Sequence, residues 1–294
     1  MKKQTLVGIL GAIMLSSACS FSAGIPSTPT AADQVGTIVA ATMQALTATP
    51  SQNVSTPFPS ETGGIPVSYE NISLVIPGGV ASSATTETMT SVDTNSGAPW
   101  EIAPTHWRFT LTGYPLQGKF FEPQVYVYPA DEYAQVNSTA GEQIDRIKKA
   151  LSGSPLLKET LPNVPFFNAA HIIAAKIQMI PFQNGSGVRE LTQYDQYPAP
   201  INNHELFYHF EGLTTDGKYY IIAILPITAP ILAEDEKPES TIPTEGVPFP
   251  SNTGPTDVYY FSVTEKLNSL EPDSFTPPLK TLDALIQSIL VKTP

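Results

Sequence analysis

The sequence is poor in cysteine, in basic residues and in charge of either sign, and each shortage excludes a class of protein. A single Cys among 294 residues cannot form an intramolecular disulfide or a cysteine-rich zinc site. The 15 Lys and Arg are outnumbered by 27 Asp and Glu, which gives a net charge of -12. Because phosphate groups attract basic surfaces, a chain this acidic has no general affinity for nucleic acid or anionic lipid. Charged residues make up only 14% and hydrophobic residues 41%, a composition too apolar for a fully disordered chain.

The first 18 residues contain the three parts of a secretory signal. Lys2 and Lys3 form a basic start, and an uncharged apolar stretch from Leu6 to Leu15 follows. This stretch is shorter than the roughly 20 residues that a membrane-spanning helix needs. Small residues then precede Cys19, so we expect residues 1–18 to be a signal peptide that is removed.

The segment Ser16-Ser17-Ala18-Cys19 resembles the lipobox of bacterial lipoproteins. In that family the signal is removed before the cysteine, whose thiol and new amino group carry acyl chains. The resemblance implies that Cys19 is lipidated and holds the protein on the extracytoplasmic side of the cell membrane. The family prefers leucine three residues before the cysteine, where this chain has Ser16. Plain secretion after a small-residue cleavage site is the alternative.

Residues 19–64 are expected to form a tether between the anchor and the folded part. Ser, Thr, Ala, Pro and Gly dominate the stretch, and prolines such as Pro50 and Pro57 interrupt both helices and sheets. Within it, apolar residues at helical spacing predict a short helix over 33–48. That helix either associates with itself or the membrane, or is a marginal helix that forms only in part.

Residues 65–294 are expected to form one α+β domain, a mostly antiparallel β-sheet with helices packed on it. Residues 72–76 predict a strand that the following Pro-Gly-Gly ends. Asp216-Gly217 between two apolar runs predicts a β-hairpin with positive φ at both turn residues. Tyr219–Leu225 is apolar on both faces, so we expect it in the middle of the sheet with cover on both sides.

Further segments complete the expected fold. The glycines of Gly185-Ser186-Gly187 predict a hairpin turn, and helices are expected over 139–151, over 256–270 and over 279–290. The order of elements resembles the PsbP-like group of α-β-α sandwiches, which also open with a short strand and a Pro/Gly break and close with an amphipathic helix. This resemblance implies a fold and carries no function with it.

No motif for catalysis is present, and the sequence predicts no cofactor and no metal site. His204 and His209 approach the zinc motif H-E-x-x-H, but they are five residues apart instead of four, which places them on opposite faces of a strand. The acidic run at 234–236 lacks the spacing of a calcium loop, and the chain has no G-x-S-x-G nucleophile motif. The catalytic residues, if any, are therefore unknown.

Aromatic residues crowd into adjacent predicted strands. Such residues either fill a sheet core through cross-strand pairs or form a binding surface. The sequence therefore gives a candidate binding surface, made of Tyr194, Tyr197, Phe207, Tyr208 and His209.

These features predict a lipid-anchored, extracytoplasmic, non-enzymatic binding or accessory module with an unknown protein or small-molecule partner. The alternatives are an envelope-associated hydrolase and a carrier of small or lipidic ligands. A carrier requires an apolar cavity of several hundred Å³, and a module that binds proteins requires an exposed apolar patch. A hydrolase requires that at least two side chains converge from the set His106, Arg108, Arg189, Glu205 and His209.

Overall fold

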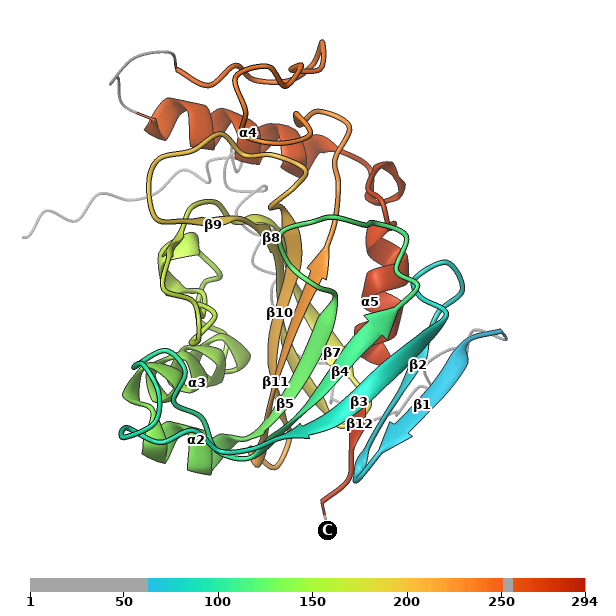
Figure 1. The fold of residues 1–294 in the computed structure, drawn as a ribbon, viewed down its shortest axis with the longest axis vertical. Helices are drawn as coiled ribbons and strands as arrows, with labels where there is room; N and C mark the ends of the chain where they lie inside the picture. The colour runs from blue at the N-terminus through green and yellow to red at the C-terminus, as the bar shows by residue number, and fades with distance from the viewer. Residues whose placement is uncertain (1–62, 251–255, 294) are drawn as a thin grey trace, which may run out of the picture. The chain divides into compact units, whose positions relative to one another are not determined.

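The computed structural model describes residues 63–250 and 256–293. The expected signal peptide, Cys19, the helix over 33–48 and the tether up to residue 62 lie outside these residues. The described residues form an α+β fold in which a mostly antiparallel sheet carries helices, as the sequence predicted (Figure 1).

The main sheet has seven strands in the order β3-β4-β5-β11-β10-β8-β7, and every neighbouring pair is antiparallel. β11 is the fourth of the seven, and all its residues are buried, as its two apolar faces predicted. The strands are β3 (Ser83–Met89), β4 (His106–Thr112), β5 (Gln124–Pro129), β7 (Ala175–Phe182), β8 (Gly185–Thr192), β10 (Phe207–Thr214) and β11 (Tyr219–Pro226).

Two smaller sheets accompany the main one. The predicted strand β2 (Ile72–Ile76) lies between β1 (Ile65–Tyr69) and β12 (Leu290–Val291), so the two ends of the described chain meet in one sheet. The two-residue strands β6 (Ala170–His171) and β9 (Tyr194–Asp195) pair with each other and help to form the site described below.

Helices cover both faces of the main sheet (Figure 1). One face packs against α2 (Ala130–Val136) and α3 (Ser138–Leu151). The other packs against α4 (Asp257–Ser269), α5 (Leu279–Gln287) and the β1-β2-β12 sheet. The helix expected over 279–290 therefore ends three residues early, because its last residues leave the helix to pair with β2. The short 3₁₀ turns are η1 (Lys158–Thr160) and η2 (Pro272–Ser274).

The hairpin at Asp216-Gly217 forms as predicted between β10 and β11, but its turn differs. Of the two residues only Gly217 has a positive φ, of 72°. The carboxylate of Asp216 accepts a hydrogen bond from the Thr214 hydroxyl at 2.7 Å and from the Lys218 amide at 3.1 Å. These bonds hold Asp216 in an ordinary conformation, so the prediction of two positive φ values was wrong.

A hairpin joins β7 and β8 at this point, as predicted, but its turn is Gln183-Asn184, and Gly185-Ser186-Gly187 already belong to β8. Gly187 pairs with Gly212 of β10, and a Cβ added to Gly187 would lie 2.5 Å from the Gly212 Cα. The ring of Phe210 lies over both positions, where any side chain would collide with it. The glycines therefore admit an aromatic ring onto the sheet and do not mark a turn.

Candidate functional site

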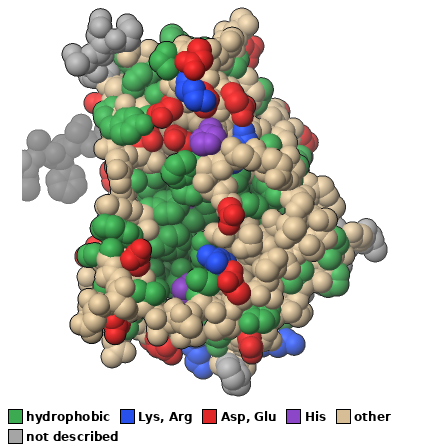
Figure 2. All heavy atoms as spheres, in the orientation of Figure 1, with side chains coloured by type: hydrophobic (Ala, Val, Ile, Leu, Met, Phe, Trp, Pro, Cys, Tyr) green, Lys and Arg blue, Asp and Glu red, His purple; other side chains and the backbone are tan. Residues whose placement is uncertain are grey.

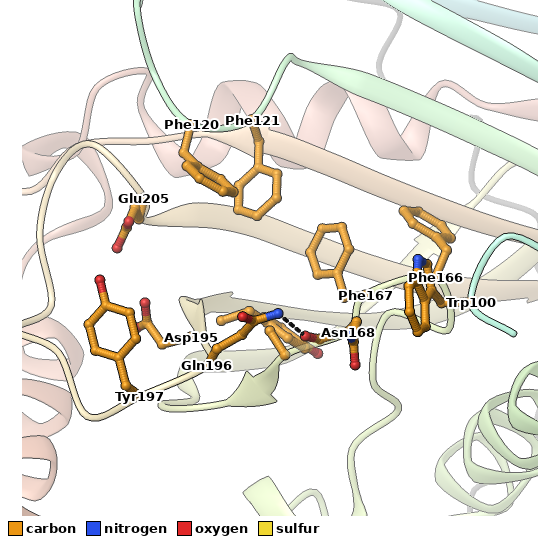
Figure 3. Close-up of a pocket in the computed structure, with 12 residues that line it drawn as sticks. Trp100, Phe120, Phe121, Phe166, Phe167, Asn168, Asp195, Gln196, Tyr197 and Glu205 are labelled. Carbon is orange, nitrogen blue, oxygen red and sulfur yellow. Dashed lines mark hydrogen bonds between the residues drawn. The ribbon is translucent and has the colours of Figure 1, made fainter. Parts of the chain in front are cut away.

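A pocket of about 430 Å³ lies on the face of the main sheet that α2 and α3 cover. Figure 2 shows hydrophobic side chains gathered in a hollow on this face, with acidic side chains along its rim. The lining comes from loops and from β9. On one side of the pocket the Gln196 side chain donates to the Asn168 carbonyl at 2.9 Å, which joins the segments that flank β6 and β9 (Figure 3). The aromatic lining residues are Trp100, Phe120, Phe121, Phe166, Phe167, Tyr194 and Tyr197.

The aromatic walls are packed against one another and are therefore held in place without a ligand. Phe121 stacks on Phe167 with ring centroids 4.9 Å apart and an interplanar angle of 12°. Phe167 in turn meets Phe166 and Tyr194 edge to face, at 5.3 Å and 5.2 Å. Phe207 of β10 lies behind them, 4.8 Å from Phe121. Such contacts between rings are favourable beyond their burial and fix the shape of the wall.

Three large aromatic side chains at the pocket stay open to solvent. Phe120 is 62% exposed, Tyr197 57% and Trp100 41%. Exposed apolar rings grouped around a concavity are typical of a binding site, whereas single exposed rings are common on any surface. The pocket therefore continues outward into an aromatic rim.

One end of the pocket is acidic. Asp195 and Glu205 line it, and the side-chain amide of Gln193 donates to both carboxylates, at 2.8 Å and 2.9 Å. Burial raises the pKa of each carboxyl group, and the negative charge of nearby Glu236 raises both further. Tyr197 donates its hydroxyl hydrogen to Glu236 at 3.0 Å. This arrangement concentrates negative charge beside the aromatic wall.

Behind the pocket runs a chain of buried ionisable groups. Tyr194 stacks on His171, with centroids 5.3 Å apart, and His171 Nε2 lies 3.0 Å from Glu190 Oε2. The other oxygen of Glu190 lies 3.0 Å from Nδ1 of His209, whose Nε2 lies 2.9 Å from Glu211 Oε1. Tyr220 closes the chain by donating its hydroxyl hydrogen to Glu211. The floor of the pocket therefore rests on a polar network inside the sheet layer.

The pKa of each ionisable group in this network depends on its burial and on its neighbours. Burial disfavours the imidazolium of His209, yet the hydrogen bonds that it donates to Glu190 and Glu211, together with their negative charge, outweigh burial and raise the His209 pKa to about 9. Burial likewise opposes ionisation of Glu190, but the two histidines outweigh it and lower its pKa. Burial dominates at Glu211 and raises its pKa. Near neutral pH His209 is therefore a buried cation between acidic side chains.

Two of the five residues of the expected binding surface line the pocket, and the other three lie elsewhere. Tyr194 and Tyr197 line the pocket. Phe207 supports its wall from behind, and His209 is buried in the network beneath it. Tyr208 points to the opposite face of the sheet, where its hydroxyl donates to Asp283 at 2.9 Å.

Most of the wall was not predicted from the sequence, because its residues lie in loops. Two Phe-Phe pairs, 120–121 and 166–167, lie outside the strands and form its centre. Adjacent phenylalanines in a loop were the available signal, since a loop has no core of its own to fill. From the sequence, Glu205 was singled out only as part of the incomplete zinc motif and among the side chains that a hydrolase would bring together, and not as a pocket residue.

The residues that a hydrolase was expected to bring together form their hydrogen bonds with other groups. No hydrogen bond joins any two of these five side chains in the described part of the chain: His106, Arg108, Arg189, Glu205 and His209. Among residues 63–250 and 256–293, no group of three or more His, Cys, Asp or Glu side chains is placed to hold a metal ion. No helix in the same residues has the length and apolar character to cross a bilayer.

Comparison of the chain with protein-family models, with curated proteins and with solved structures finds no match. The function of the pocket therefore has to be argued from its own residues.

Proposed function

We propose that this chain is a lipid-anchored, extracytoplasmic binding module without a catalytic role, and that the aromatic pocket takes a small ligand with a flat or apolar body. The observation that carries the proposal is the pocket itself. Its volume of about 430 Å³ falls within the usual range of roughly 300 to 1,000 Å³ for small-molecule sites. Its walls are mostly aromatic rings and its two carboxylates lie at one end, a composition that suits a small-molecule site.

Preorganisation supports the same proposal. The rings of Phe121 and Phe167 are stacked already, and Tyr194 is held between Phe167 and His171. A ligand that enters does not have to order these side chains, so less of its binding free energy is lost to immobilisation.

Trp100 provides a direct test of the pocket. The chain has two tryptophans, and the second, Trp107, lies on β4 with its ring 6.1 Å from Tyr219, on the other side of the sheet. In the full chain carrying Trp107→Phe, titration with 2-phenylethanol or 2-phenylethylammonium is expected to change the Trp100 fluorescence saturably. The matched variant Trp100→Phe, which keeps Trp107, should show no change. Absence of any saturable change with either probe in Trp107→Phe would contradict the proposal.

The anchor is tested separately. Cys19→Ser removes the thiol that the lipobox-like segment supplies for acylation, so the variant should leave the membrane fraction while the parent chain stays in it. Mass spectrometry of the mature parent should find an acylated N-terminal cysteine. An unacylated mature chain, or one that keeps residues 1–18, would contradict the anchor without touching the pocket.

A further inference from the structure

The acidic end of the pocket has no positive partner. Asp195 and Glu205 line it, and no Lys, Arg or His is among the lining residues in the described part of the chain. The nearby ammonium of Lys119 is engaged with Glu234 at 2.6 Å and does not line the pocket. Two carboxylates therefore stand together with only neutral donors between them.

Each carboxylate also keeps one oxygen without a hydrogen bond. Asp195 is only 8% exposed, yet the sole hydrogen bond of its carboxylate within the described residues is the one from Gln193 to Oδ2. Glu205 accepts from Gln193 and from Asn202, but both bonds go to the same oxygen, Oε2. Neither free oxygen is sealed from solvent in the described residues, so a hydrogen-bond donor that enters the pocket can reach both, and a charged donor forms the stronger bond.

The rings beside these oxygens favour the same kind of ligand. Figure 3 shows Asp195, Tyr197 and Glu205 at one end of the pocket, with Phe120, Phe121 and Phe167 along its wall. Aromatic faces attract cations within about 6 Å through their quadrupole, and a desolvated site strengthens the attraction. The net charge of -12 adds a long-range field that repels anions and draws cations.

We infer that the ligand of this pocket is a small organic cation, with its amine or ammonium group at Asp195 and Glu205 and its apolar body against the Phe121–Phe167 wall. The inference rests on the proposed binding function and adds the charge of the ligand. A neutral ring fills the wall but leaves the two free oxygens unpaired, and an anion is repelled by them.

Three probes of matched size test the inference with Trp107→Phe as the reporter. These are 2-phenylethylammonium, 2-phenylethanol and phenylacetate, which share the ring and differ in the charge at the end of the chain. The cation is expected to bind about ten-fold more tightly than the alcohol, and the anion more weakly than either.

Substitutions then test whether Asp195 and Glu205 are the source of the preference for the cation. Asp195→Asn and Glu205→Gln should each reduce the ratio of cation affinity to alcohol affinity several-fold. Glu239→Gln removes one charge from an exposed position outside the pocket and should leave the preference as it is. The comparison of the three probes needs no substitution at the acidic end, so it decides the question even where one of these two variants fails to fold.

The outcomes separate the two proposals. Equal binding of the cation and the alcohol, or tighter binding of the anion, overturns the inference while the binding function stands. A cation preference that survives in both Asp195→Asn and Glu205→Gln also overturns it, because the charge is then recognised elsewhere. No saturable signal with any of the three probes overturns the binding function and the inference together.

Discussion

The Nδ1 nitrogen of His209 lies 3.0 Å from Oε1 of Glu190 in the interior of the protein, where both side chains are almost fully buried. The second ring nitrogen of His209 lies 2.9 Å from Glu211, so one imidazole joins two buried carboxyl groups. Removing one member of such a group leaves the others buried without compensation.

His209→Leu is therefore expected to lower the free energy of unfolding by about 3 to 5 kcal/mol, measured by urea denaturation. His204→Leu is the matched control, because His204 lies in a loop, its ring meets Phe120 edge to face, and no hydrogen bond of that ring occurs among the described residues. It should cost less than about 1 kcal/mol. Equal costs for the two variants would show that the buried contacts of His209 add nothing to stability.

The same imidazole predicts how stability depends on pH. The His209 pKa rises from 6.5 to about 9 on folding, so the folded state binds the proton more tightly than the unfolded state. The contribution of protonated His209 to the free energy of unfolding is complete below pH 6.5 and is lost as the pH rises through about 9. The free energy of unfolding should fall across that window, and this fall should be missing from His209→Leu. An NMR titration that finds the His209 ring losing its proton near pH 6.5 would contradict the assignment.

An ion pair between a buried arginine and a partly buried aspartate joins α5 to the main sheet. Nη1 of Arg189, a nearly buried side chain on β8, lies 3.3 Å from each carboxylate oxygen of Asp283 on α5. Asp283→Ala leaves this guanidinium without its counterion and should cost about 3 to 5 kcal/mol in a thermal or urea unfolding experiment.

Asp273→Ala provides the control for that substitution. Asp273 forms an exposed ion pair with Lys280 at 3.2 Å, and such pairs contribute about 0 to 1 kcal/mol. The account requires the two aspartates to differ clearly. Similar small losses would mean that Arg189 does not depend on Asp283.

The glycine pair between β8 and β10 predicts a steric effect. A Cβ on Gly187 would meet the Gly212 Cα at 2.5 Å, so Gly187→Ala should destabilise the fold by about 1 to 3 kcal/mol or more. Gly78→Ala is the matched control, because nothing lies within 4 Å of its Cβ position. Differential scanning calorimetry should show a lower Tm for Gly187→Ala and almost none of that change for Gly78→Ala. A Gly187→Ala protein as stable as the parent would show that the strands can separate at little cost.

The sequence predicted those parts of the fold that depend on local pattern. The two apolar faces of Tyr219–Leu225 placed β11 in the middle of the sheet, and Asp216-Gly217 marked the hairpin. Local pattern gave wrong element boundaries where residues distant in the sequence determine the structure. Gly185 to Gly187 form a strand because they pair with β10 on one side and β7 on the other, and Leu290 lies outside α5 because it pairs with β2.

The candidate site was predictable only in small part for the same reason. Tyr194 and Tyr197 were visible as part of an aromatic-rich stretch, and both line the pocket. The Phe-Phe pairs come from separate loops that meet only in the folded chain, and no spacing in the sequence connects them. Asp195 and Glu205 are linked through Gln193, a contact that depends on how β9 and the following loop fold back.

The most direct test of the central claim is a crystal structure of the full chain with 2-phenylethylammonium at saturating concentration. The account predicts the phenyl ring against Phe121 and Phe167, with the ammonium group within hydrogen-bond distance of Asp195 or Glu205. A pocket that stays empty at that concentration, or a probe bound only elsewhere on the protein, would contradict it.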